Sequence, residues 1–268
     1  MMYFLSVVLI GTTYPIFLEV ISSEKISVGP PFYNKLIAPF LIPFLFFMAI
    51  GPKLKWVKSD LSDKIYLILF FIISLFLSIL IVQNFKIEFL LNTILITFAF
   101  YLFFITVRDF VSKKYKNLSQ NLAHFGFSLF ILSILFNNIF TTEIITNLKV
   151  GETYTSEKFN IKFENLSQKQ KQNFQSFVGK FSIRDIKGNI EIMEPELRIY
   201  NQPNITTSEA DIKTSLLSDK FITMNIVQSQ DYFNIRYQIK PLMVWIWFSV
   251  LLIASAGFLR IIKTRYEN

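Results

Sequence analysis

The sequence predicts an α-helical polytopic membrane protein of about six transmembrane helices, with a small β-rich extracytoplasmic domain inserted before the last helix. Three observations lead to this class. Long apolar runs recur along a chain that is 52% hydrophobic and only 17% charged. Lysine and arginine collect in alternate loops. A stretch of 100 residues, 141–240, is polar and alternates with period two. The net charge of +8 does not indicate a nucleic-acid partner, because the composition is too apolar for a basic soluble domain.

Five uncharged runs reach or approach the length of about 20 residues that a helix needs to cross a bilayer. They are residues 2–18, 65–82, 89–107, 122–140 and 242–259. A sixth run, 36–50, is shorter and holds Pro39 and Pro43, which remove backbone donors. The first run lacks a basic leader and a small-residue cleavage site, so we expect a mature helix and not a signal peptide.

The distribution of positive charge predicts the orientation of these six spans. One set of loops, with the C-terminal tail, holds eleven basic residues: Lys53, Lys55, Lys58, Lys64, Arg108, Lys113, Lys114, Lys116, Arg260, Lys263 and Arg265. The short loops of the other set hold Lys25, Lys35 and Lys86. Basic loops stay in the cytoplasm, so both termini should be cytoplasmic. We expect helices 1–5 in 1–140, the outer domain in 141–240, and the last helix with its tail in 241–268.

The outer segment shows strand patterns and one helix signal. Apolar Phe159, Ile161 and Phe163 alternate with polar neighbours, as in a half-buried strand. Gly188-Asn189 lies between two alternating runs and predicts a tight hairpin. Thr206 lies three residues before Glu209, which matches a capping box and predicts a helix over 208–217. The polar stretch 168–175 predicts a flexible loop.

His124, the only histidine, lies within the fifth span. An ionisable group there is a functional candidate by default, and a neutral imidazole can ligate a metal or a haem iron. Alternatively, His124 hydrogen-bonds a Thr or Asn of another helix. Trp245 and Trp247, at the outer end of the last span, suit interfacial anchoring, with stacking on a porphyrin as the alternative.

Other chemistry has little support in the sequence. With no cysteine, the chain cannot form a disulfide, bind zinc through thiolates or use a thiol nucleophile. Glu194 and Glu196 are spaced as a glycosidase-type acid pair could be, but a salt bridge to Arg198 on a solvated strand edge is the simpler interpretation. Nucleophile-elbow, zinc-protease and phosphate-loop motifs are absent, and the uncharged spans argue against a secondary transporter.

Several stretches, taken together and in order, resemble the C-terminal half of CcmF, the large membrane subunit of the bacterial cytochrome c haem lyase. They are Gly11-Thr12-Thr13-Tyr14-Pro15, Ile26-Ser27-Val28-Gly29-Pro30-Pro31-Phe32, Gly51-Pro52 with Trp56, Ala123-His124-Phe125-Gly126, Thr207-Ser208-Glu209-Ala210-Asp211-Ile212 with Asp219, Lys240-Pro241 and Trp245-Ile246-Trp247. The resemblance covers essentially the whole chain.

The resemblance implies a role in cytochrome c maturation. In that family, haem from a carrier protein is attached to Cys-x-x-Cys-His apocytochromes outside the membrane, and a b-type haem is held in the membrane by two histidines. His124 matches the second of those ligands, and the family's first membrane histidine and Trp-rich haem-handling loop have no counterpart in this sequence. We therefore expect a C-terminal module that shares haem b with a partner chain, either as one piece of a split lyase or as a truncated copy.

The expected partners follow from the same resemblance. They are an N-terminal haem lyase chain with the Trp-rich loop, a haem carrier protein, and apocytochrome c with its thiol-handling subunit; no nucleic acid is expected. The expected location is the bacterial inner membrane, with a mitochondrial inner membrane as the alternative. A competing hypothesis is a non-catalytic membrane anchor that presents a β interaction domain, with His124 in ordinary helix packing.

Overall fold

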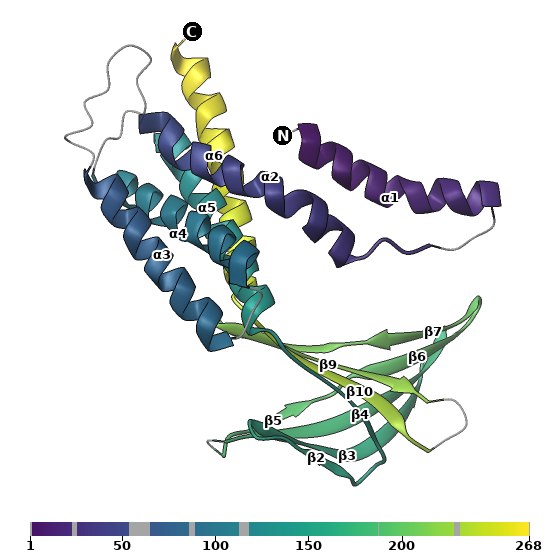
Figure 1. Ribbon diagram of the computed structural model, residues 1–268. Coiled ribbons are helices and arrows are strands. Elements are labelled where there is room, and N and C mark those ends of the chain that lie inside the picture. Colours follow the sequence, from purple (N-terminus) through teal and green to yellow (C-terminus); the bar gives the residue numbers. More distant parts are fainter. Residues whose placement is uncertain are drawn as a thin grey trace. The chain divides into compact units, whose positions relative to one another are not determined.

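The computed structural model describes residues 2–22, 26–53, 65–85, 89–112, 118–186, 188–227 and 231–267 (Figure 1). Within these ranges the chain forms six long α-helices and a β-sandwich, which confirms the predicted fold class. All six helices are long and apolar enough to cross a membrane. Trp56 and most of the basic loop residues that predict the orientation lie outside the described residues.

The helices extend beyond the predicted spans at one or both ends. They are α1 (Met2–Ser22), α2 (Pro30–Ile50), α3 (Ile65–Phe85), α4 (Phe89–Val111), α5 (Leu118–Phe140) and α6 (Met243–Glu267), and the short 3₁₀ helix η1 (Gly51–Lys53) follows α2. Pro30 and Pro31 occupy the first positions of α2, where a missing N–H costs nothing. Pro39 and Pro43 are accommodated inside the same helix.

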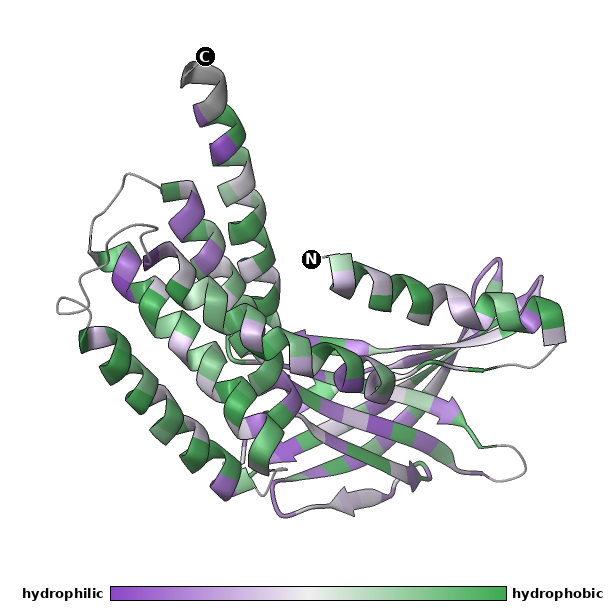
Figure 2. Ribbon diagram, turned by 45° about the horizontal axis from the view of Figure 1, so that its top comes forward, coloured by the Kyte–Doolittle hydropathy of each residue, from purple (hydrophilic) through white to green (hydrophobic). Residues whose placement is uncertain are grey.

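The contacts divide the chain into two compact units. Met1–Leu132 with Ser249–Asn268 form the membrane unit, and Ser133–Phe248 form the second unit, which contains all strands of the described residues. Figure 2 shows their different hydropathy patterns: the helices are mostly hydrophobic, whereas hydrophobic and hydrophilic residues alternate along the strands. Boundaries at 140/141 and 240/241 remain our proposed domain division.

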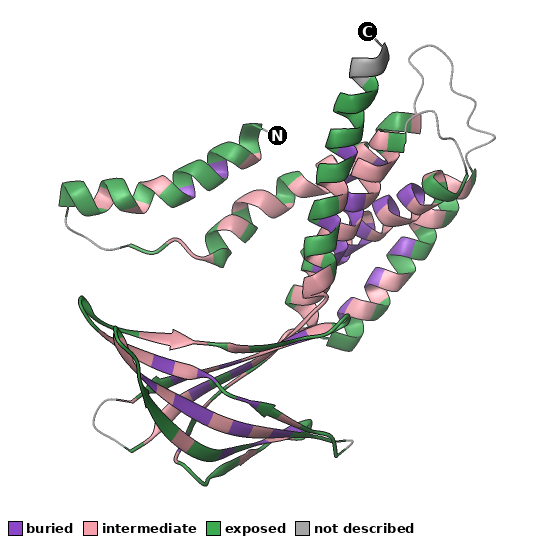
Figure 3. Ribbon diagram, turned by 180° about the vertical axis from the view of Figure 1, so that it is seen from behind, coloured by how far each residue is buried: buried purple, intermediate pink, exposed green. Residues whose placement is uncertain are grey.

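Small polar side chains join the helices of the membrane unit. The hydroxyls of Ser78 on α3 and Thr97 on α4 lie 2.6 Å apart, and those of Thr106 on α4 and Ser128 on α5 lie 3.0 Å apart. Helix contacts of this kind suit a bilayer, where lipid is as apolar as leucine and close packing must come from small or hydrogen-bonding residues. Buried residues gather on α4, whereas α1 and α6 are exposed along much of their length (Figure 3).

The second unit is a sandwich of two antiparallel sheets. One sheet has the order β1-β10-β9-β8 and the other β2-β3-β4-β6-β7, with β5 also paired to β4. The strands are β1 (Thr142–Leu148), β2 (Thr153–Thr155), β3 (Phe159–Gln170), β4 (Phe174–Asp185), β5 (Ile190–Met193), β6 (Glu196–Asn201), β7 (Asn204–Glu209), β8 (Asp211–Thr214), β9 (Ser218–Ile226) and β10 (Phe233–Pro241).

The alternating apolar residues meet between the two sheets. Phe163 and Phe181 are fully buried and stack with ring centroids 4.4 Å apart. Phe159 meets the buried Tyr237 edge to face at 5.0 Å. Burial raises the pKa of the Tyr237 hydroxyl, so this side chain stays neutral at physiological pH. The period-two pattern therefore predicted the core-facing side of β3 correctly.

The predicted hairpin at Gly188-Asn189 is confirmed. It joins β4 to β5, and the Asp185 amide donates to the Asn189 carbonyl at 3.0 Å across its base. Gly188 has a φ of 82°, in the left-handed region that glycine enters without steric cost.

Two other local predictions in this unit are wrong. No helix forms over 208–217. Thr206 lies in β7 and pairs with Ile199 of β6, and β8 follows β7 immediately. The β-branched run Ile205-Thr206-Thr207 favours a strand, and neighbouring strands override the capping-box signal. The expected loop over 168–175 is largely a strand hairpin, since β3 continues to Gln170 and β4 begins at Phe174. Cross-strand hydrogen bonds satisfy the backbone of this polar stretch.

Candidate functional site

His124 lies in the second turn of α5, half-buried among three helices of the membrane unit. The surrounding residues come from the end of α2, the 3₁₀ helix η1, the C-terminal half of α4 and the first turns of α5. They line a cavity of about 20 Å³: Met48, Ala49, Pro52, Ile105, Thr106, Asp109, Gln120, Asn121 and His124. A cavity of this size holds roughly one water molecule, and it is far too small for a porphyrin.

The imidazole of His124 is not used for a hydrogen bond between helices. Within the described ranges, no residue donates to it or accepts from it. The nearby Thr106 hydroxyl donates instead to the Phe103 carbonyl at 2.8 Å and lies 3.0 Å from the Ser128 hydroxyl. A half-buried imidazole without such a partner retains a nitrogen lone pair for a ligand.

A charged cluster lies at the same end of the membrane unit. Lys53 of η1 forms an ion pair with Asp109 of α4, and Asp109 also lines the cavity beside His124. The Arg108 guanidinium lies 3.3 Å from the centre of the Tyr66 ring on α3, a cation–π contact. Because α4 continues to Val111, Arg108 and Asp109 are helical residues. The charge pattern predicted a loop at Arg108, and no local pattern in the sequence indicates these pairings.

Gly126 packs against α6. A Cβ atom built there would lie 3.0 Å from Ile253 Cγ1, 3.1 Å from Leu252 Cβ and 3.2 Å from the Ile253 backbone nitrogen. Two residues of helix correspond to a rotation of about 200°, so His124 projects from the opposite side of α5. Gly126 therefore allows α6 to pack closely against α5.

Replacing Gly126 with valine should force α5 and α6 apart. We expect a loss of about 1–3 kcal/mol in the stability of the membrane unit, the usual cost of overpacking. Gly257→Val on α6 is the matched control, since nothing lies within 4 Å of a Cβ at that position. Denaturation of both variants in detergent, followed by far-ultraviolet circular dichroism, measures the difference. Equal stability of the two variants would contradict the close packing at Gly126.

Trp245 and Trp247 lie in the first turns of α6. The Trp245 indole N–H donates to the Leu216 carbonyl at 2.9 Å, and its ring meets Phe248 edge to face at 5.9 Å. Trp247 is 66% exposed. These contacts suit anchoring at the membrane surface, whereas porphyrin stacking remains a prediction for both residues.

The structure brings Glu196 and Arg198 together and separates them from Glu194. The Arg198 Nε atom lies 2.9 Å from Glu196 Oε2, and the Glu209 carboxylate lies 3.8 Å from the same guanidinium. Hydrogen bonds to Glu196 and Tyr200 raise the pKa of Arg198. Strand β6 lies between β4 and β7 and is not an edge. The predicted salt bridge between Glu196 and Arg198 is therefore present, whereas the predicted solvated strand edge is wrong.

Two further positions of the resemblance, Gly11 and Asp219, lie in packed surroundings. Gly11 of α1 lies against Tyr33 of α2, whose hydroxyl would be 2.7 Å from a Cβ at position 11. Asp219 at the start of β9 is buried and pairs in register with Thr214 and Lys240. Outside the stretches of the resemblance, the hydrogen bond from Arg236 lowers the pKa of the exposed Glu143 on β1.

Six membrane-competent helices, an inserted β-sandwich, and a histidine in a span with no hydrogen-bond partner among the described residues define the class: a polytopic membrane protein with a candidate haem- or metal-ligating residue. Residues 139–241 match the family model of the CcmF C-terminal β-sandwich. The resemblance to the C-terminal half of CcmF is therefore confirmed, and the β-sandwich is the part of the chain that the family model matches.

Curated relatives extend this similarity to nearly the whole chain. The cytochrome c-type biogenesis proteins CcmF of Pseudomonas fluorescens and of Escherichia coli K12 are each 25% identical over 98% of the chain, and CycK of Bradyrhizobium diazoefficiens is 24% identical over 97%. A solved structure of the cytochrome c haem lyase CcmF matches 95% of the chain with a TM-score of 0.70 at 19% identity. The chain spans about 42% of the length of these curated relatives and 43% of that structure.

Proposed function

We propose that this chain acts in cytochrome c maturation as the C-terminal module of a haem lyase, and that His124 supplies one axial ligand to a b-type haem in the membrane. The observation that carries the proposal is the single histidine, which is half-buried in a span and has no hydrogen-bond partner among the described residues. It lies in the stretch Ala123-His124-Phe125-Gly126, one of those that resemble CcmF. The names of the relatives support the cytochrome c role.

The residues around His124 fit one axial ligand but not a complete haem pocket. The adjoining cavity of about 20 Å³ admits no macrocycle. The haem would therefore contact the half-exposed imidazole. The partner chain would form the rest of the haem pocket and supply the second histidine. Haem iron provides the redox chemistry when bound. This chain holds the imidazole on a helix fixed by the Thr106–Ser128 contact and by packing at Gly126.

The orientation follows the positive charge. With the eleven basic residues of one loop set in the cytoplasm, both termini are cytoplasmic and 141–240 lies in the bacterial periplasm, or in the intermembrane space if the membrane is mitochondrial. There the β-sandwich meets apocytochrome c, its thiol-handling subunit and the haem carrier protein. The Trp-rich haem-handling loop comes from the N-terminal portion of the lyase.

The test is the visible spectrum of the purified chain with and without the N-terminal portion of a haem lyase. We expect reduced-minus-oxidised bands of a low-spin b haem in the assembly, and only weak haem binding by this chain alone. An assembly that supports cytochrome c maturation but contains no b haem would overturn the ligand assignment.

A non-catalytic anchor is the second candidate, favoured by the small size of the cavity at His124. It predicts that the chain still captures partner proteins in pulldown experiments and that its haem content does not depend on His124. Loss of partner capture on deletion of 141–240, with an unchanged haem spectrum in His124→Ala, would favour the anchor.

A further inference from the structure

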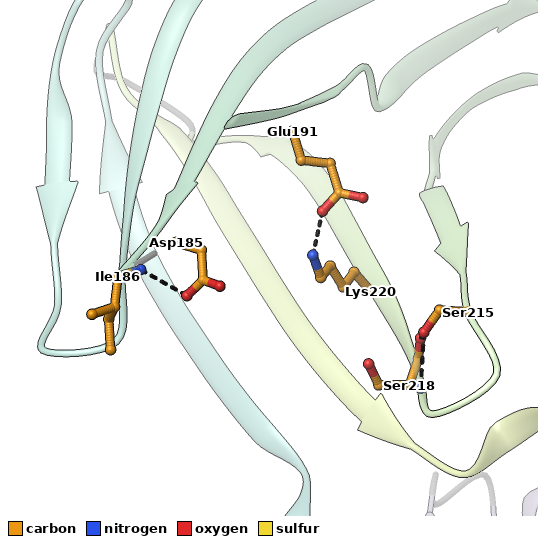
Figure 4. A network of polar contacts seen from close by, with 6 residues as sticks. All are labelled: Asp185, Ile186, Glu191, Ser215, Ser218 and Lys220. Carbon is orange, nitrogen blue, oxygen red and sulfur yellow. Dashed lines mark hydrogen bonds and ion pairs between the residues drawn. The ribbon is translucent and has the colours of Figure 1, made fainter. Parts of the chain in front are cut away.

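We propose that the hairpin between β8 and β9 is a membrane-inserting finger, with Leu216 and Leu217 in the lipid interface beside the start of α6. The hairpin has only these two leucines between Ser215 and Ser218. The Ser215 amide donates to the Ser218 carbonyl at 3.1 Å, and the Ser215 hydroxyl donates to the same carbonyl at 2.6 Å. Figure 4 shows the two serines closing this turn. The finger is therefore a short and well-defined projection.

The backbone of the finger is bonded to the first residues of the last spanning helix. The Leu217 carbonyl accepts from the Leu242 amide at 2.9 Å, and the Leu216 carbonyl accepts from the Trp245 indole at 2.9 Å. Leu242 has a φ of 58°, in the left-handed region that is sterically unfavourable for a leucine. The hydrogen bond to the finger holds Leu242 in this conformation immediately before α6 begins at Met243.

A third hydrogen bond joins this junction to the end of α5. The Asn137 side chain, in the last turn of α5, donates to the Pro241 carbonyl at 2.6 Å. The end of one span and the start of another are thus joined at the base of the finger. Since an indole at a helix end favours the headgroup region, the hydrogen bond from Trp245 places the leucines at that depth.

The two leucine side chains contribute little to the sandwich core. Both are 72% exposed, whereas the core residue Ile222 of β9 is fully buried. Adjacent exposed leucines at the tip of a turn are unfavourable in water and favourable in a lipid interface. Trp247, 66% exposed, and Phe248, 44% exposed, add apolar surface on the first turns of α6. The occupant of this surface is the outer leaflet of the membrane that α6 spans.

The absence of cysteine makes the test direct. In the full chain reconstituted in lipid vesicles, Leu216→Cys carries a single environment-sensitive fluorophore; Leu217→Cys is the replicate. Val150→Cys is the matched control, because Val150 is 47% exposed in the turn after β1, about 20 Å along that strand from the end of α5.

At position 216 we expect blue-shifted emission, with quenching by shallow nitroxide-labelled lipids several-fold stronger than at position 150. Aqueous iodide should quench the label at position 150 and not that at position 216. Iodide quenching at 216 equal to that at 150 would overturn the proposal. Protection of 216 from both quenchers would also overturn it, since it would mean that protein covers the leucines.

Discussion

Replacing His124 with alanine should remove the b-haem bands from the assembled lyase. The substitution deletes the only imidazole of this chain; Met48, whose thioether can also ligate haem iron, lines the same cavity and is left unchanged. Changing a group that merely supports a metal ligand costs 10–100-fold in affinity, so loss of the ligand itself should cost at least about 100-fold. Haem content per assembly, read from the pyridine haemochrome spectrum, measures the effect.

Asn121→Ala is the matched control for this experiment. Asn121 lies on α5 three residues before His124 and lines the same cavity, so both variants shorten a polar side chain in the same packing environment. We expect the Asn121 variant to keep its haem. If both variants lose haem to the same extent, a general packing defect explains the loss and the ligand assignment fails.

Replacing Phe181 with alanine should unfold the sandwich while leaving haem binding intact. Phe181 is fully buried and stacks on Phe163, and truncation of such a core phenylalanine costs about 3–5 kcal/mol. Because Phe181 and His124 belong to different compact units, the b-haem bands should persist while cytochrome c maturation is lost. Amide hydrogen exchange of β3 and β4 in the full chain measures the unfolding directly.

Ile186→Ala provides the control for the core substitution. Ile186 is 73% exposed in the hairpin after β4, and surface substitutions of this kind change stability by less than about 0.5 kcal/mol. Maturation should continue in this variant. If Phe181→Ala unfolded the sandwich and maturation nevertheless continued, the outer domain would have no role in docking.

The sequence allowed prediction of those parts of the fold that depend on local pattern. Uncharged apolar length located the six helices, since a bilayer tolerates few alternatives. Alternation placed Phe163 toward the core, and the turn chemistry of Gly188 located a hairpin. The helix predicted from Thr206 and Glu209 failed because pairing between β6 and β7, a non-local contact, overrides a four-residue capping signal.

The candidate site was only partly predictable. His124 stood out as the only histidine, within the fifth predicted span, but its surroundings depend on how α2, α4 and α5 pack. The pairing of Lys53 with Asp109 joins residues 56 positions apart, and the Asn137 contact with Pro241 joins residues 104 apart. Neither contact produces a periodic pattern in the sequence. The close packing of Gly126 against Ile253 likewise depends on the position of α6, a helix distant in the sequence.

The most direct test of the haem role is imidazole rescue of a His124→Gly assembly, followed by its reduced-minus-oxidised visible spectrum. Glycine deletes the ligand and leaves room at the half-buried position for a free imidazole. If His124 binds the iron, the low-spin b-haem bands should be lost in the variant and return when imidazole is added. Bands identical to those of the wild-type assembly before any addition would contradict this role.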